Sequence, residues 1–204
     1  MLLNHKSAIE FMVDAVPTEG ITGPVIVDLQ AKLMRDLLRD ARDIGSIRRR
    51  VVNIDGSVYT PSSIPSLLED TLNAIVNKVR SIRNPVEAAF FLWVNLAYLQ
   101  PFADGNKRTS RLSANMPLML YNCAPLSFLD VERSDYATAM LGIYEQRDVS
   151  AAVDLFEFIY RRSIQKYSVL RASVAAPDPI RTKYRQTLNE LMQFVVFHGR
   201  TLDA

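Results

Sequence analysis

The residues best suited to chemistry lie together in the segment from Gln100 to Arg111. Its glycine, Gly105, lets a ligand approach the backbone closely. The residues after it are expected to open a helix, where free amide groups and the helix dipole favour an anion. Lys107, Arg108 and Arg111 add three cations, and the two arginines share one helix face, from which both can bind phosphate. The segment therefore predicts a phosphate-binding site that a nucleoside triphosphate would fill.

Asp104 stands directly before this glycine. A lone carboxylate beside phosphate donors is a usual means of holding a magnesium ion that phosphate oxygens also bridge. An acidic cap followed by basic surface residues also occurs at helix starts that bind nothing. The position of the segment between two apolar helices favours the functional interpretation.

These two helices belong to a mainly helical chain. Asn84-Pro85-Val86-Glu87 supplies a helix start, and the helix after it is apolar on most of its surface, which predicts a central position. Apolar residues three or four positions apart predict helices over 24–45, 66–82, 85–99, 107–121, 134–146, 150–174 and 178–198, with a kink at Pro117. β-Favouring residues around Asp55-Gly56 predict a hairpin at about 50–60. The expected fold class is all-α, a helical bundle with one small β-hairpin.

The composition limits the classes of function. With 24 Lys and Arg against 22 Asp and Glu, the net charge of +2 gives no global positive field, so no direct nucleic-acid binding is expected. The uncharged run 112–129 holds polar residues and two prolines, so no membrane span is expected. No signal peptide is visible, and the one cysteine, Cys123, fits a reducing compartment, so a cytoplasmic protein is expected. Few glycines and no repeat predict a single domain over 1–204, and the run Arg48-Arg49-Arg50 is interpreted as a solvated strand edge.

The segment resembles the signature loop of the Fic (Fido) family. That pattern runs His, any residue, Phe, any residue, Asp or Glu, Gly, Asn, Gly or Lys, Arg, two residues, Arg. The matching positions are Phe102, Asp104, Gly105, Asn106, Lys107, Arg108 and Arg111. The resemblance covers about residues 1–165, so the expected C-terminal helical extension at about 178–200 is a less general feature of the family.

The resemblance implies an activity and a role for each matching residue. Most of the family transfers AMP from ATP to a Ser, Thr or Tyr hydroxyl of a target protein. The hairpin would be the flap that holds this target. Phe102 would anchor the loop. Asp104 would hold Mg²⁺, Gly105, Asn106 and Lys107 would form the anion hole, Arg108 would bind the β-phosphate region, and Arg111 would bind the terminal phosphate.

The first position of the pattern departs from the family. The family has a histidine there that accepts the proton of the target hydroxyl, and this chain has Gln100. A carboxamide has no useful basicity near neutral pH, and general-base help is worth about 10²–10⁴-fold in rate. The chain has two histidines, His5 and His198, both far from Gln100 in sequence, and neither is expected to replace it.

Three functions remain open from the sequence. The leading one is a protein adenylyltransferase that is weakened or altered because of Gln100. The second is a non-catalytic regulatory module that binds nucleotide or a partner protein. The third is a phosphotransferase, because some family members that share the lysine corresponding to Lys107 transfer the γ-phosphate. No copy of the family's inhibitory motif is present at the expected spacing, which leaves open a separate inhibitory protein or segment. A homodimer is also left open.

Overall fold

The computed structural model of this chain describes residues 2–173, and the helix expected at 178–198 lies outside them. The chain divides into two compact units, Met1–Ile164 and Gln165–Ala204, and the account below concerns the first. The single domain expected over the whole chain stays a prediction. The elements in chain order are α1 (Leu2–Glu19), α2 (Gly23–Met34), the short 3₁₀ helix η1 (Ala41–Asp43), α3 (Pro65–Ser81), α4 (Pro85–Leu99), α5 (Asn106–Ser113), α6 (Asn115–Leu120), α7 (Arg133–Leu141), the π-helical turn η2 (Gly142–Gln146) and α8 (Ser150–Ser173).

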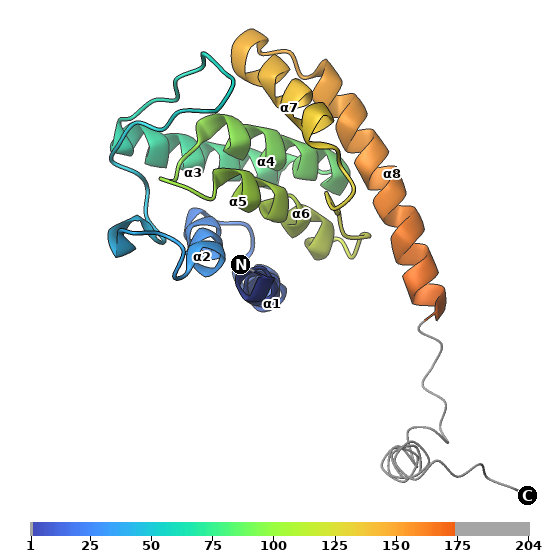
Figure 1. The fold of residues 1–204 in the computed structure, drawn as a ribbon. Helices are drawn as coiled ribbons and strands as arrows, with labels where there is room; N and C mark the ends of the chain where they lie inside the picture. Colours follow the sequence, from blue (N-terminus) through green and yellow to red (C-terminus); the bar gives the residue numbers. More distant parts are fainter. Residues whose placement is uncertain (1, 174–204) are drawn as a thin grey trace, which may run out of the picture. The chain divides into compact units, whose positions relative to one another are not determined.

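Helix α4 is the central element, as its sequence predicts (Figure 1). It begins at Pro85, and the side chain of Asn84 caps it by accepting a hydrogen bond from the amide of Val86 at 2.9 Å. Its successive faces enter two different hydrophobic cores. Ala88, Leu92 and Leu96 pack with α1, α2 and α3, whereas Ala89, Trp93 and Ala97 pack with α7 and α8. The C-terminal end of α4, which leads into the candidate site, is therefore fixed from both sides.

Three of the expected helices have different bounds. The helix expected over 134–146 ends as α7 at Leu141, and the π-helical turn η2 follows it. Helix α2 ends at Met34 rather than near Gly45, because Arg35 leaves the helical conformation and Asp36 takes a positive φ of 59°. The expected helix over 107–121 is two helices, α5 and α6, which meet at Ala114 rather than at a kink at Pro117. Proline has no N–H to donate to the carbonyl four residues earlier, which explains a break one turn before it. Helix α1 was not among the expected helices.

The expected β-hairpin at 50–60 is wrong, because no strand is present in residues 2–173. The turn itself forms: the amide of Ser57 donates to the carbonyl of Ile54 at 3.1 Å, and Gly56 has a φ of 79°. The residues after the turn bind other elements instead of the opposite arm. The amide of Val58 donates to the carboxylate of Glu145 on η2 at 3.1 Å. An isolated two-stranded hairpin is marginally stable in water, so such contacts are enough to replace it. Residues 50–62 are called the flap segment below.

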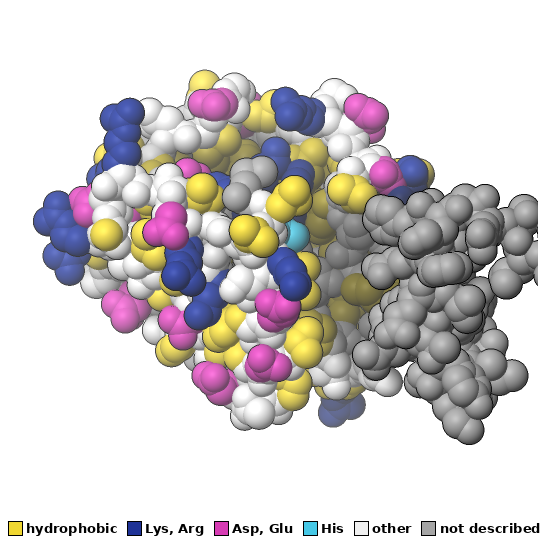
Figure 2. Space-filling view, turned by 60° about the horizontal axis from the view of Figure 1, so that its bottom comes forward, with side chains coloured by type: hydrophobic (Ala, Val, Ile, Leu, Met, Phe, Trp, Pro, Cys, Tyr) yellow, Lys and Arg dark blue, Asp and Glu magenta, His cyan; other side chains and the backbone are white. Residues whose placement is uncertain are grey.

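The surface carries no concentrated charge on the face that Figure 2 shows, where basic and acidic side chains are interspersed with hydrophobic ones. This distribution agrees with the net charge of +2. No helix among residues 2–173 is long and apolar enough to cross a membrane. The cytoplasmic location stays a prediction.

Candidate functional site

The loop between α4 and α5 is held in shape by two residues of the motif. The side chain of Asn106 accepts a hydrogen bond from the amide of Phe102 at 2.9 Å and donates one to its carbonyl at 2.7 Å. Phe102 itself is buried in the first core. The first hydrogen bond of α5 runs from the amide of Thr109 to the carbonyl of Gly105 at 2.8 Å. The side chain of Asn106 is thus committed to the loop, and its contribution to an anion site is its backbone amide at the start of α5.

The turn at Gly105 requires glycine on two grounds. Its φ is 83°, and a Cβ at this position would lie 2.8 Å from Cγ and Sδ of Met34 at the end of α2. Helix α2 also supports the loop through Gln30, which is fully buried. The amide group of Gln30 donates to the carbonyl of Asp104 at 3.2 Å and accepts from the amide of Gly45 at 2.7 Å. The backbone can therefore approach a ligand closely on a loop that is supported from behind.

A cleft of about 380 Å³ lies beside this loop. The flap segment, the loop and the α7–η2 region line it together, and the motif contributes Gln100, Asp104, Asn106 and Lys107. Its other wall includes Tyr136, Met140 and Tyr144, which makes this side aromatic and apolar. Small-molecule sites in proteins have volumes of about 300–1,000 Å³ and this mixture of apolar and polar walls. The structure thus brings four of the seven expected site residues to one cleft, whereas Gly105, Arg108 and Arg111 do not line it.

The three cations of the motif have different surroundings. The Nζ atom of Lys107 lies 4.3 Å from the ring centre of Tyr136, and burial together with the charges of Arg111 and Arg133 lowers its pKa. Arg108 lies 3.9 Å from the carboxylate of Asp104, the residue one helical turn earlier. The guanidinium of Arg111 lies 3.8 Å from the ring centre of Tyr136, and its Nε atom is buried without a hydrogen-bond partner.

Asp104 meets the requirements for one ligand of a magnesium ion. Its side chain lines the cleft and is 61% exposed. One carboxylate oxygen accepts a hydrogen bond from the amide of Gly105, and no hydrogen bond to the other is recorded in the described part of the chain. Within residues 2–173, no group of three His, Cys, Asp or Glu side chains could hold a metal ion. The donor set fits a cation whose remaining ligands are phosphate oxygens and water, which is how Mg²⁺ is usually bound.

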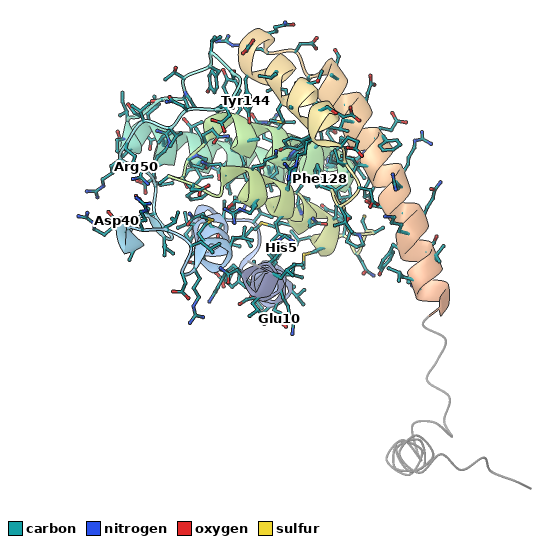
Figure 3. All side chains as sticks on the ribbon, viewed as in Figure 1. His5, Glu10, Asp40, Arg50, Phe128 and Tyr144 are labelled. Carbon is teal, nitrogen blue, oxygen red and sulfur yellow. The ribbon has the colours of Figure 1, made fainter. Side chains whose placement is uncertain are left out.

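Gln100 ends α4 in the left-handed conformation, with a φ of 50°. Its amide nitrogen donates to the carbonyl of Ala97 at 2.6 Å and lies 3.4 Å from the hydroxyl of Tyr144. That hydroxyl also donates to the carbonyl of Ala97 at 3.2 Å, and burial raises its pKa. Neither group is a base near neutral pH. The exposed His5 lies on α1, on the opposite side of α5 from Tyr144 (Figure 3), and His198 lies outside the described residues.

Arg48 is buried, so its assignment to a solvated strand edge was wrong. Its guanidinium donates to three backbone carbonyls, those of Gln100 at 2.6 Å, of Arg50 at 2.8 Å and of Ser62. Its amide donates to the carbonyl of Pro101 at 3.0 Å. The base of the flap segment is thereby tied to the motif loop. Sequence reasoning missed this contact because the run Arg48-Arg49-Arg50 gives no sign of which arginine turns inward.

Comparisons with known proteins identify relatives of this chain. Residues 21–118 match the sequence profile of the Fic/DOC family. The chain is 32% identical over 123 residues to the protein adenylyltransferase Fic of Nematostella vectensis, an alignment that covers 58% of this chain and 28% of the relative. It is 26% identical over 137 residues to the protein of the same name from Aedes aegypti, covering 67% and 27%. The chain thus spans little more than a quarter of the length of these curated relatives.

The fold is shared with solved structures. The chain resembles Fic-1 (residues 134–508) of C. elegans with a TM-score of 0.68 and 22% identity, covering 85% of this chain and 52% of that one. It also resembles BepC of Bartonella tribocorum, solved with bound AMPPNP, with a TM-score of 0.60 and 15% identity, covering 78% and 82%. Both likenesses concern the helical fold, which the described residues therefore have in common with these two proteins.

Proposed function

Residues 21–118 match the Fic/DOC family, and from this premise we propose that the chain binds ATP with Mg²⁺ in the cleft beside the 100–111 loop. We further propose that it is a protein adenylyltransferase whose chemical step is weakened by Gln100. The observation that carries the proposal is the meeting of Asp104, Lys107 and the first amides of α5 at one cleft with an aromatic wall. A cation, an anion hole and a carboxylate are the groups that a magnesium nucleotide requires.

Each side chain has a role in this reaction that its chemistry permits. Lys107 and the first amides of α5 would bind the phosphates, with Arg108 at the β-phosphate and Arg111 at the terminal one. Asp104 would hold Mg²⁺, which offsets negative charge on the phosphates when bound. The oxygen of a target hydroxyl attacks the α-phosphorus, the new O–P bond forms, and the bond to pyrophosphate breaks. Gln100 would orient that hydroxyl, whose proton passes to water.

The missing base limits the rate of this step. A general base typically contributes about 10²–10⁴-fold, so transfer is expected to be slower than in a chain with histidine at position 100 by a factor in this range. The flap segment lines the cleft through residues 52–55. We propose that the target protein binds against this segment. A separate inhibitory partner and a homodimer are also proposed. No contact within residues 2–173 tests either of them.

A second candidate is a non-catalytic module that binds nucleotide and a partner. The observation that favours it is the commitment of the Gln100 amide nitrogen to the carbonyl of Ala97, which gives this side chain a structural use as the cap of α4. A phosphotransferase using the same cleft is the third candidate, and Lys107 is the residue that favours it.

Labelled nucleotide separates the three candidates. The protein is incubated in a lysate with Mg²⁺ and with ATP labelled on the α-phosphate or, separately, on the γ-phosphate. We expect slow transfer of label from the α-phosphate to protein and none from the γ-phosphate. Transfer from the γ-phosphate alone would establish phosphorylation instead. No transfer in either arm, with ATP binding retained in calorimetry, would establish the binding module.

A further inference from the structure

Tyr136 on α7 contacts both cations of the motif that have no acidic neighbour. Its ring centre lies 4.3 Å from Nζ of Lys107 and 3.8 Å from the guanidinium carbon of Arg111. Phe128, in the loop that leads into α7, lies 5.1 Å from the same guanidinium (Figure 3 labels this residue). No carboxylate in the described part of the chain forms an ion pair with Lys107 or Arg111. Both cations therefore contact an aromatic ring instead of an acidic side chain.

An aromatic partner differs from an acidic one in what it leaves free. A carboxylate would use the N–H donors of arginine and would repel phosphate. A ring contacts the face of the guanidinium, and the donors of this group lie in its plane, so they stay available for an anion. The Nε atom of Arg111 is such a donor, since it is buried and has no hydrogen-bond partner in the described part of the chain. Burial of an unpaired charged donor is costly, which points to an absent anionic ligand.

The position of the Tyr136 ring is itself fixed. Tyr136 is 3% exposed, and its hydroxyl accepts a hydrogen bond from the indole nitrogen of Trp93 at 3.4 Å. Trp93 is fully buried on the central helix α4 and also lies 5.3 Å from the ring of Phe128. The contacts thus run from α4 through α7 to α5. A rigid core residue determines where two flexible cationic side chains lie.

We propose that Tyr136 is a positioning residue, whose ring holds Lys107 and Arg111 ready for the polyphosphate part of a nucleotide. This inference rests on the proposed function and extends it to a residue outside the motif. Immobilising a long side chain on binding weakens the affinity by roughly two- to twelvefold, and the ring meets that cost for two side chains before the ligand arrives. Loss of the ring is therefore expected to weaken polyphosphate binding about five- to 140-fold.

The test compares three variants of the full chain. Tyr136→Leu removes the ring, Tyr136→Phe keeps it without the hydroxyl, and Phe156→Leu removes another buried aromatic of the same core that has no cation contact. Calorimetry measures binding of ATP and of inorganic tripolyphosphate, which has no base or sugar. NMR of the ¹⁵N-labelled protein without ligand follows the Nε–H signal of Arg111, assigned with Arg111→Lys, because a ring at 3.8 Å shifts it strongly.

The expected results differ among the variants. Tyr136→Leu weakens the binding of both ligands about five- to 140-fold and moves the Arg111 signal toward that of an exposed arginine, whereas Tyr136→Phe and Phe156→Leu change neither. Unchanged binding in Tyr136→Leu, an unshifted Arg111 signal, or equal weakening in Phe156→Leu would each overturn the role of Tyr136. If the wild type binds neither ligand, the proposed function is overturned, and this inference with it. The wild-type measurement alone identifies that outcome.

Discussion

At the residue scale, the motif side chains differ in how much hydrogen-bonding capacity they keep for a ligand. Asn106 uses both ends of its amide on Phe102, and Gln100 uses its nitrogen on Ala97. Lys107 and Arg111 contact aromatic faces and keep their donors. The cations proposed to bind phosphate therefore keep donors for a ligand, while the position that would take a proton holds an amide. In the proposed function, binding and proton transfer depend on different residues of the same short loop.

Arg108 allows a test of anion binding with a matched control. Arg108 and Arg161 each lie one helical turn after an acidic residue and within ion-pair distance of it. Arg108→Ala is expected to weaken ATP binding by at least about 1.5 kcal/mol, the lower end for a hydrogen bond to a charged group. Arg161→Ala removes the same type of surface pair, far from the motif in sequence, and should leave the affinity unchanged. Equal affinities of the two variants in calorimetry would remove Arg108 from the site.

The residues of the site were predictable where they are local in sequence. Asp104, Asn106 and Lys107 follow one another closely, so their spacing alone indicates a loop and a helix start, and the structure brings them to the cleft with Gln100. Tyr136 and Arg48 reach the same loop from distant segments. No spacing in the sequence relates them to it, because their contacts depend on how helices pack.

At the scale of elements, the flap segment is held at its base by one buried arginine and at its tip by contacts with η2. Tyr59 stacks on Tyr98 with ring centres 4.5 Å apart, and Ser57 donates to the carboxylate of Glu145 at 2.9 Å. The sequence predicted the turn at Asp55-Gly56 correctly, because dihedral preference is local. It could not predict that the residues after the turn would contact α4 and η2 rather than the arm before the turn.

Arg48 is predicted to stabilise the fold through this segment. Arg48→Leu leaves three backbone carbonyls without their donor, and the free energy of unfolding should fall by about 2–4 kcal/mol. Arg49→Leu is the control, because Arg49 is exposed and should change stability by no more than about 0.5 kcal/mol. Urea denaturation followed by circular dichroism measures both. A loss in Arg48→Leu as small as that of the control would show that the buried guanidinium is not needed to hold the segment.

Helix positions were mostly predictable, and the exceptions have a physical reason. Helices α3, α4 and α8 agree with the expected ranges because each buries a regular apolar face or begins at a strong cap. Helix α1 escaped prediction because Ile9 and Val13, which are exposed, obscure the period of its buried residues. Helix α2 ends early, at the non-helical Arg35, and the chain turns back so that Gly45 donates a hydrogen bond to the buried Gln30.

At the scale of the whole molecule, α4 connects the site to both hydrophobic cores of the first unit. One face of this helix packs with α1, α2 and α3, which support the loop through Gln30 and Met34. The other face packs with α7, η2 and the first turns of α8. Tyr136 of α7 and Tyr144 of η2 line the cleft from this side. The loop beside the cleft is thus supported by the first core, while Tyr136, Met140 and Tyr144 of its aromatic wall belong to the second.

The central claim is that Gln100 leaves nucleotide binding intact and slows only the transfer step. The most direct measurement compares wild type and Gln100→His for ATP affinity by calorimetry and for transfer of label from α-labelled ATP to protein. We expect affinities within about twofold of each other and transfer faster by up to about 10²–10⁴-fold in Gln100→His, because the substitution supplies a general base at the end of α4. A wild type that already transfers label as fast as Gln100→His, or a Gln100→His variant that binds ATP normally and transfers no faster, would contradict the claim.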